Sequence, residues 1–258
     1  MGVTYKGIGH LQFSCKSIED TLKFYIDKLG FRKKFELSGT ADDGFNWHID
    51  YLEVAHGQLL ELLDLDYGDN LASGRSFNGY TLGVPADKYE ALAIKECDSI
   101  IYDPDGNEIT IARADRMHIS HITLKCNDYA NMKDFYGNKL GFQKYREREE
   151  ETVYEIANGE YLRLIPRSYE VDSASSFSHL CFEVEDILSV ARLMDEQGLM
   201  MRDEDYRYLN DDPSETAKEI KKVAMCGSLS AVTHDPEGNM VEFMQYTDQS
   251  LQLMENQI

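Results

Sequence analysis

The sequence repeats itself, and this repetition constrains the fold more than any other feature. The segment GHLQFSC, which begins at Gly9, is matched by SHITLKC, which begins at Ser120. Both are followed, at the same distance, by an FY pair and a KLGF segment. A third copy, SHLCFEV, begins at Ser178, and a weaker fourth, GYTLGV, begins at Gly79. Such self-similarity indicates that one supersecondary unit is used several times.

Each unit has the same internal pattern. A strand with alternating polar and apolar residues comes first, and an amphipathic helix follows it. In the first unit Ser17 is a plausible N-cap of this helix and Gly30 a plausible stop. The chain therefore divides into four βαβββ-type units at about 6–66, 77–113, 118–167 and 175–246. The second unit is too short for a full set of strands, because only a few residues separate its expected helix near 87–96 from the strand that follows.

The turn sequence DPxGN occurs twice, at Asp103–Asn107 and at Asp235–Asn239. Pro, Gly and Asn favour a tight turn, so each copy predicts a hairpin. After the second turn, Glu242 is the only carboxylate on a largely apolar strand face. Burying an unpaired carboxylate costs on the order of several kcal/mol, so Glu242 needs either solvent or a cation. A polar stretch before this hairpin, 210–222, predicts a short surface helix where a lid could lie.

Composition narrows the class of protein. The 258 residues carry a net charge of −21, which disfavours binding to nucleic acid and to anionic membranes. No segment is apolar enough to span a bilayer or to act as a signal peptide. The five cysteines are widely spaced and form no CxxC pair, so neither a disulfide framework nor a structural zinc site fits. These features predict a cytoplasmic protein.

Taken together, the repeated units, the FYxxxLGF segments and the DPxGNxxE ending resemble the vicinal oxygen chelate superfamily, which includes glyoxalase I, bleomycin-resistance proteins and extradiol dioxygenases. The resemblance implies an α+β fold in which four units pair into two curved mixed sheets with a metal cleft. It also implies a first glyoxalase-like domain at 1–114, with a degenerate second unit, and a second domain at 115–258. Because four units lie in one chain, a monomer could be complete.

In this superfamily the metal ligands come from the first and last strands of a unit. Carried over residue by residue, the first unit offers His10 and Glu61, and the fourth offers His179 and Glu242. The third unit offers His121. Its other ligand position holds Arg163, and the second unit has Gly79 or Tyr80 and Thr110 at the two positions. Imidazole and carboxylate together suit a divalent first-row metal.

Two pairings of the units remain open. If neighbours pair, the third with the fourth, the site is His121, His179 and Glu242. If the outer units pair, the first with the fourth, the site is His10, Glu61, His179 and Glu242. The outer pairing is our prediction, because it leaves one ligand-type residue without a role and the neighbour pairing leaves two.

The expected activity is that of a metal-dependent lyase or isomerase of the glyoxalase I type. One divalent ion (Zn, Ni, Mn, Co or Fe) would chelate two adjacent substrate oxygens and stabilise an enediolate, while Glu242 or Glu61 moves a proton. The alternatives are a metal-free binding or resistance protein, a non-haem Fe(II) dioxygenase and a thiol transferase. Extradiol enzymes carry a Tyr where this chain has Val232, which weakens the dioxygenase alternative.

Overall fold

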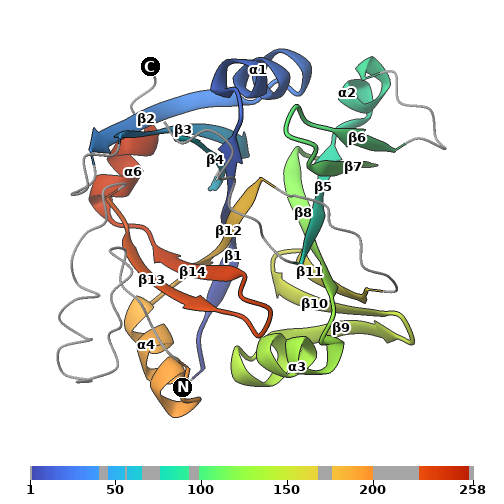
Figure 1. The fold of residues 1–258 in the computed structure, drawn as a ribbon, viewed down its shortest axis with the longest axis vertical. Helices are drawn as coiled ribbons and strands as arrows, with labels where there is room; N and C mark the ends of the chain where they lie inside the picture. Colours follow the sequence, from blue (N-terminus) through green and yellow to red (C-terminus); the bar gives the residue numbers. More distant parts are fainter. Residues whose placement is uncertain are drawn as a thin grey trace.

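The computed structural model describes residues 2–40, 46–55, 57–65, 76–92, 99–167, 176–199 and 227–255. These residues form two seven-stranded mixed sheets, which lie side by side in Figure 1. Sheet one has the order β13-β14-β12-β1-β4-β3-β2 and sheet two the order β6-β7-β5-β8-β11-β10-β9. The predicted α+β fold with two mixed sheets is confirmed.

The strands of sheet one come from the first and fourth units: β1 (Tyr5–Cys15), β2 (Arg32–Thr40), β3 (Asn46–Ala55), β4 (Gln58–Leu65), β12 (Phe177–Val184), β13 (Leu229–His234) and β14 (Met240–Gln245). Those of sheet two come from the second and third units: β5 (Phe77–Val84), β6 (Ile100–Tyr102), β7 (Glu108–Arg113), β8 (His118–Cys126), β9 (Gln143–Arg148), β10 (Glu151–Ala157) and β11 (Glu160–Pro166). The outer units therefore pair as predicted, and the neighbour pairing is wrong. Each sheet takes strands from both sides of the division at residues 114 and 115, so that division stays a prediction.

The helices are short and follow the first strand of each unit: α1 (Ile18–Lys23), α2 (Ala86–Ala91), α3 (Tyr129–Lys133) and α4 (Ile187–Glu196). In units one and three the helix continues as a π-helical turn, η1 (Phe24–Lys28) and η2 (Asp134–Lys139). Ser17 caps α1 as predicted, since its hydroxyl accepts a hydrogen bond from the Asp20 N–H. The helix α6 (Asp248–Glu255) ends the described chain, and the helix predicted within 210–222 lies outside the described residues.

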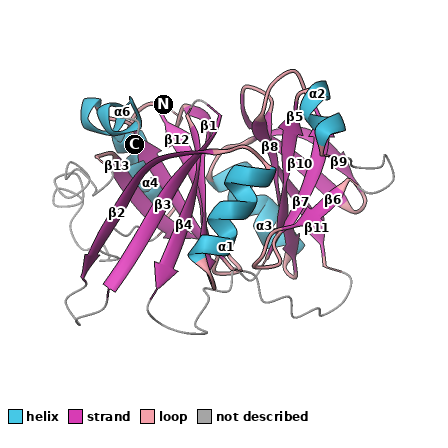
Figure 2. Cartoon of the chain, turned by 90° about the horizontal axis from the view of Figure 1, so that it is seen from above, coloured by secondary structure: helices cyan, strands magenta, loops and turns pink. Residues whose placement is uncertain are grey.

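The inner faces of the two sheets share one core. Apolar side chains from every unit contribute to it, and Figure 2 shows α1 and α3 between the sheets. Phe77 of sheet two stacks on Phe177 of sheet one with ring centroids 4.1 Å apart, and Phe13 meets both rings edge-on. The inner faces of the two sheets are buried against each other. The polar residues that alternate with the core residues along each strand therefore lie on the outer faces, away from the other sheet.

Two buried tyrosine–aspartate pairs explain two of the repeated motifs. The Tyr25 hydroxyl of the first FY pair donates to Asp103 Oδ2 at 2.8 Å, and the Tyr136 hydroxyl of the second donates to Asp235 Oδ2 at 2.9 Å. Each aspartate also accepts bonds from the backbone of its own DPxGN turn. Burial raises the pKa of Asp235 to about 6, although these donors favour the ionised form. The FY motif of one unit thus fixes the turn of the next unit.

We expect Tyr136→Phe to destabilise the fold by about 1–3 kcal/mol, because the change leaves a buried carboxyl group without one of its donors. Urea denaturation followed by circular dichroism measures the loss. Tyr102→Phe is the matched control, since Tyr102 is 59% exposed, and it should stay within about 0.5 kcal/mol of the wild type. Equal stability of the two variants would contradict a structural role for the pair.

Candidate metal centre

Four ligand-type side chains meet on the outer face of sheet one. The order β14-β12-β1-β4 places Glu242, His179, His10 and Glu61 on four adjacent strands. Each carboxylate lies opposite the residue two positions after the histidine of its unit: Glu61 pairs with Gln12, and Glu242 pairs with Cys181. Each of the two units therefore contributes one histidine and one carboxylate to the site, and the two pairs have the same register.

The distances between these side chains are short. His10 Nε2 lies 2.8 Å from His179 Nε2 and 2.8 Å from Glu242 Oε2, and His179 Nε2 lies 3.1 Å from the same oxygen. On the other side, His10 Nδ1 lies 3.3 Å from Glu61 Oε1. His10 is only 2% exposed, and His179 and Glu61 are buried as well. The four sequence-predicted residues of the outer pairing are thus brought together.

The electrostatics of the cluster reflect two carboxylates beside two imidazoles. Burial opposes charge on His10, but Glu61 and Glu242 outweigh it and raise the pKa of His10. Burial would likewise disfavour the Glu242 carboxylate, yet His10 and His179 hold the pKa of Glu242 well below its usual range. The two carboxylates therefore favour a positive charge at the centre of the cluster.

The residues fit a divalent cation by their chemistry. Two imidazoles and two carboxylates form a mixed donor set of the kind that first-row metals prefer. His10 Nδ1 and His179 Nδ1 are buried and have no hydrogen-bond partner among the residues that the structure describes, and such atoms are rare in folded proteins. His10, Glu61 and His179 form one group with ligand atoms within 4.8 Å of one another, and His10, Cys181 and Glu242 form another.

Sequence reasoning missed three polar residues beside the cluster. Gln12 donates from Nε2 to Glu61 Oε2 at 3.0 Å, and the Ser230 hydroxyl donates to Glu242 Oε1. The sulfur of the buried Cys181 lies within 4.8 Å of ligand atoms of His10 and Glu242. Gln12 and Cys181 each stand two residues after a candidate histidine, on the same strand face. That spacing is the signal that could have identified both.

Apolar side chains and α6 cover the cluster. Beside His10 and Glu61, a small cleft is lined by aromatic and aliphatic residues of sheet one and by the start of the C-terminal segment: Phe35, Tyr51, Leu59, Met244, Tyr246 and Ser250. The rings of Phe35 and Tyr51 stack with centroids 4.1 Å apart. Figure 1 shows α6 beside β2 and above β14. The apolar lining therefore lies directly beside His10 and Glu61, both of which are buried.

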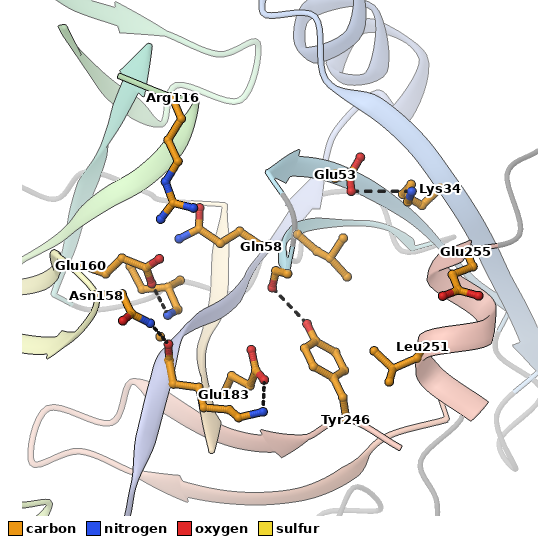
Figure 3. A pocket seen from close by; sticks show the side chains of 15 residues that line it. Lys34, Glu53, Gln58, Arg116, Asn158, Glu160, Glu183, Tyr246, Leu251 and Glu255 are labelled. Atoms are coloured by element: carbon orange, nitrogen blue, oxygen red, sulfur yellow. Dashed lines mark hydrogen bonds and ion pairs between the residues drawn. The ribbon is translucent and has the colours of Figure 1, made fainter. Parts of the chain in front are cut away.

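A larger cavity, of about 700 Å³, adjoins this cleft and shares Leu59 and Tyr246 with it. Figure 3 shows its charged lining, in which Arg116 and Glu160 come from sheet two and its loops. The Tyr246 hydroxyl donates to the Gly57 carbonyl at 3.1 Å, and both residues line the larger cavity. The cavity is large enough for the remote part of a small ligand bound at the cluster.

Sheet two has different chemistry at the equivalent positions. His121 lies on β8, apart from the cluster, and Arg163 stands opposite Thr123 as Glu61 stands opposite Gln12. Thr110 pairs with Thr81 as Glu242 pairs with Cys181. Gly79 occupies the position of His179, where a Cβ atom would come within 2.5 Å of the Glu108 carbonyl oxygen. No ligand side chain can stand there without movement of β7.

Comparison with known proteins assigns the family. A sequence profile of the Glyoxalase/Bleomycin resistance protein/Dioxygenase superfamily matches residues 118–243. The uncharacterized protein YwkD of Bacillus subtilis (strain 168) is 33% identical in an alignment of 92 residues that covers 31% of this chain and 72% of that protein. The chain is a member of the Glyoxalase/Bleomycin resistance protein/Dioxygenase superfamily.

Two solved structures share the fold over nearly the whole chain. Glyoxalase I from Zea mays superposes with a TM-score of 0.67 at 15% identity and covers 97% of this chain and 96% of its own. A putative dioxygenase from Bacillus subtilis gives 0.65 at 14% identity, with 95% and 86% covered. At such identities the likeness establishes the fold alone. Within the described residues, no helix has the length and apolar character needed to cross a membrane.

The cavity contains one acidic group with a shifted pKa. Glu160 Oε2 accepts a hydrogen bond from the Ile8 N–H at 2.6 Å and so joins β11 to β1. Burial raises the pKa of Glu160 to about 7, although the Ile8 N–H and Arg116 favour the ionised form. The folded protein therefore holds a proton that the unfolded chain has lost between about pH 4.5 and pH 7.

We expect Glu160 to make the free energy of unfolding fall as the pH rises through this window, because the unfolded state binds fewer protons there. Glu160→Gln removes the titrating group, so the variant should gain stability relative to the wild type between pH 4.5 and pH 7. Urea denaturation of both proteins at several pH values measures the difference. A difference that does not change with pH would show that Glu160 does not titrate in this range.

Proposed function

We propose that this chain is a metal-dependent lyase or isomerase that moves a proton between adjacent carbons of a small oxygen-chelating substrate. The convergence of His10, His179, Glu61 and Glu242 on the outer face of sheet one carries the proposal. Superfamily members with solved structures of the same fold include a glyoxalase I, which supports this class of reaction. The four residues are proposed as the ligands of one divalent ion.

The bound ion would supply a Lewis acid that polarises two neighbouring substrate oxygens and so acidifies the adjacent C–H bond. Glu61 and Glu242 lie on the two sides of the histidine pair, on β4 and β14. Either carboxylate is placed to take a proton from one carbon and return it to the next. Gln12 orients Glu61 and Ser230 orients Glu242, so each carboxylate keeps one oxygen turned toward the cluster.

The surroundings suit such a proton transfer. The stacked rings of Phe35 and Tyr51, together with Leu59, form an apolar wall beside His10 and Glu61. A dry environment strengthens the interactions of charged groups and protects a reactive intermediate from water. The adjoining cavity provides space for the rest of the substrate, whose identity the proposal leaves open.

Metal analysis of protein purified without chelator tests the ligand set. We expect about one divalent ion per chain, and we expect His10→Ala, Glu61→Gln, His179→Ala and Glu242→Gln each to lower metal affinity by about 100-fold or more, since loss of even an outer partner of a ligand costs about 10–100-fold. His121→Ala is the matched control, because it changes the equivalent histidine of sheet two, and it should keep the full metal content.

Activity provides a second readout. Deuterium incorporation from D₂O into 2-oxoaldehyde–thiol adducts and α-hydroxyketones detects proton transfer at the carbon beside the chelated oxygens. If the wild type binds no metal even after reconstitution, the ligand set is wrong and a metal-free binding protein becomes the better interpretation. If metal is lost in His121→Ala and retained in Glu61→Gln, the proposed site must move to the other sheet.

A further inference from the structure

The outer face of sheet two contains a second cluster of functional side chains, built at the positions where sheet one has its ligand-type residues. Arg163 occupies the place of Glu61, and β9 and β10 add Arg146 and Glu151 beside it. The positively charged Arg163 thus lies where the proposed metal centre has the negatively charged Glu61. This reversal of charge excludes a second site of the same kind and favours an anionic ligand.

Over β9, β10 and β11, the outer face of sheet two carries more arginines than carboxylates: it has Arg163, Arg146 and Arg148, which lies opposite Glu151, against Glu151 and Glu155, which lies opposite Tyr161. Arg163 Nε donates to Glu151 Oε1 at 2.6 Å, while Arg146 donates from Nε and from its terminal nitrogen to Oε2 at 3.0 and 2.7 Å. Two guanidinium groups therefore share one carboxylate, and each arginine side chain stays 42% exposed. The surplus charge is notable in a chain whose net charge is −21. Guanidinium groups favour planar carboxylates, which they bind through paired hydrogen bonds.

Aromatic rings adjoin the arginines. Tyr161 stacks on His121 with ring centroids 4.9 Å apart. The ring of Tyr145 contacts that of Tyr161 in a tilted arrangement, also with centroids 4.9 Å apart. Tyr145 is 59% exposed, so one side of this stack is available to a further ring. His121 adds no charge near pH 7, because burial and then Arg163 and Arg146 lower its pKa to about 4.

This face is more open than its counterpart in sheet one. The described residues include four large hydrophobic side chains that are exposed, and three of them, Ile100, Tyr102 and Tyr145, belong to the outer face of sheet two. Ile100 and Tyr102 pair with Thr110 and Glu108, which face away from the shared core. In sheet one, Phe35 of β2 and Tyr51 of β3, the strands that correspond to β9 and β10, are buried.

We propose that the outer face of sheet two binds a small aromatic carboxylate, whose carboxylate pairs with Arg163 and Arg146 and whose ring packs on Tyr145 and Tyr161. The excess of arginines favours a ligand with an anionic group, and the exposed ring of Tyr145 favours a ligand with an aromatic ring. Binding here is independent of the proposed metal centre, which lies on the other sheet. The site therefore adds a second small-molecule ligand to the protein.

Titration of the ¹⁵N-labelled full-length chain with sodium benzoate, at constant ionic strength, tests the proposal. We expect saturable chemical-shift changes in β9, β10 and β11. Acetate has the charge without the ring and benzyl alcohol has the ring without the charge, so each should bind about tenfold more weakly or worse. Arg163→Gln should weaken benzoate binding by about tenfold or more, and Tyr145→Ala by about threefold to tenfold.

Two variants serve as controls. Arg192→Gln removes an exposed arginine of α4 that also pairs with a carboxylate, and His10→Ala disables the candidate metal centre, and both should bind benzoate like the wild type. Arg146→Gln provides a further test should Arg163→Gln fold poorly, because β9 is exposed along its length. The proposal is overturned if shifts in these three strands are absent, if benzyl alcohol binds as tightly as benzoate, or if Tyr145→Ala and the arginine variants bind like the wild type.

Discussion

The antiparallel pairing of β1 with β12 is the contact on which the candidate centre depends. It joins the first and fourth units across most of the chain and sets His10 opposite Cys181, with His179 opposite Gln12. Because alternate residues face opposite sides, this register sends both imidazoles to the outer face and the neighbouring Leu11 and Leu180 into the shared core. A shift by one residue would bury the histidines and expose the core, so the core itself holds the site in register.

The same logic explains why the most visible sequence motifs are structural. The FY pairs and DPxGN turns are not ligands; their tyrosine and aspartate side chains form the buried hydrogen bonds Tyr25–Asp103 and Tyr136–Asp235. Each bond links a helix of one unit to a hairpin of the next, across the space between the two sheets. A buried carboxyl group is costly without donors, and each of these has both a hydroxyl and backbone N–H groups.

The two sheets illustrate how one architecture supports two kinds of chemistry. Sheet one has carboxylates beside its histidines under a cover of apolar side chains and α6, which suits a cation in a dry environment. Sheet two has Arg163 at the position of Glu61 and a glycine, Gly79, at that of His179, where the β7 backbone leaves no room for a side chain. Among the described residues, the second face therefore has no equivalent set of ligand-type side chains, and it has arginines and exposed rings instead.

The sequence by itself determined the repeated units, their strand alternation, the Ser17 cap and the ligand-type residues His10, Glu61, His179 and Glu242, because these follow from local patterns and from their repetition. It favoured the pairing of the first and fourth units only through the count of ligand-type residues, since the pairing itself is settled by burial of inner faces such as Phe13, Phe77 and Phe177 against one another. It could not show that Gln12 and Ser230 hold the two carboxylates, or that Arg146 and Arg163 share Glu151, because these contacts depend on the register between paired strands and on side-chain conformation. Local patterns specify which face a side chain occupies, whereas its neighbours across that face depend on strand order, which only the packed core decides.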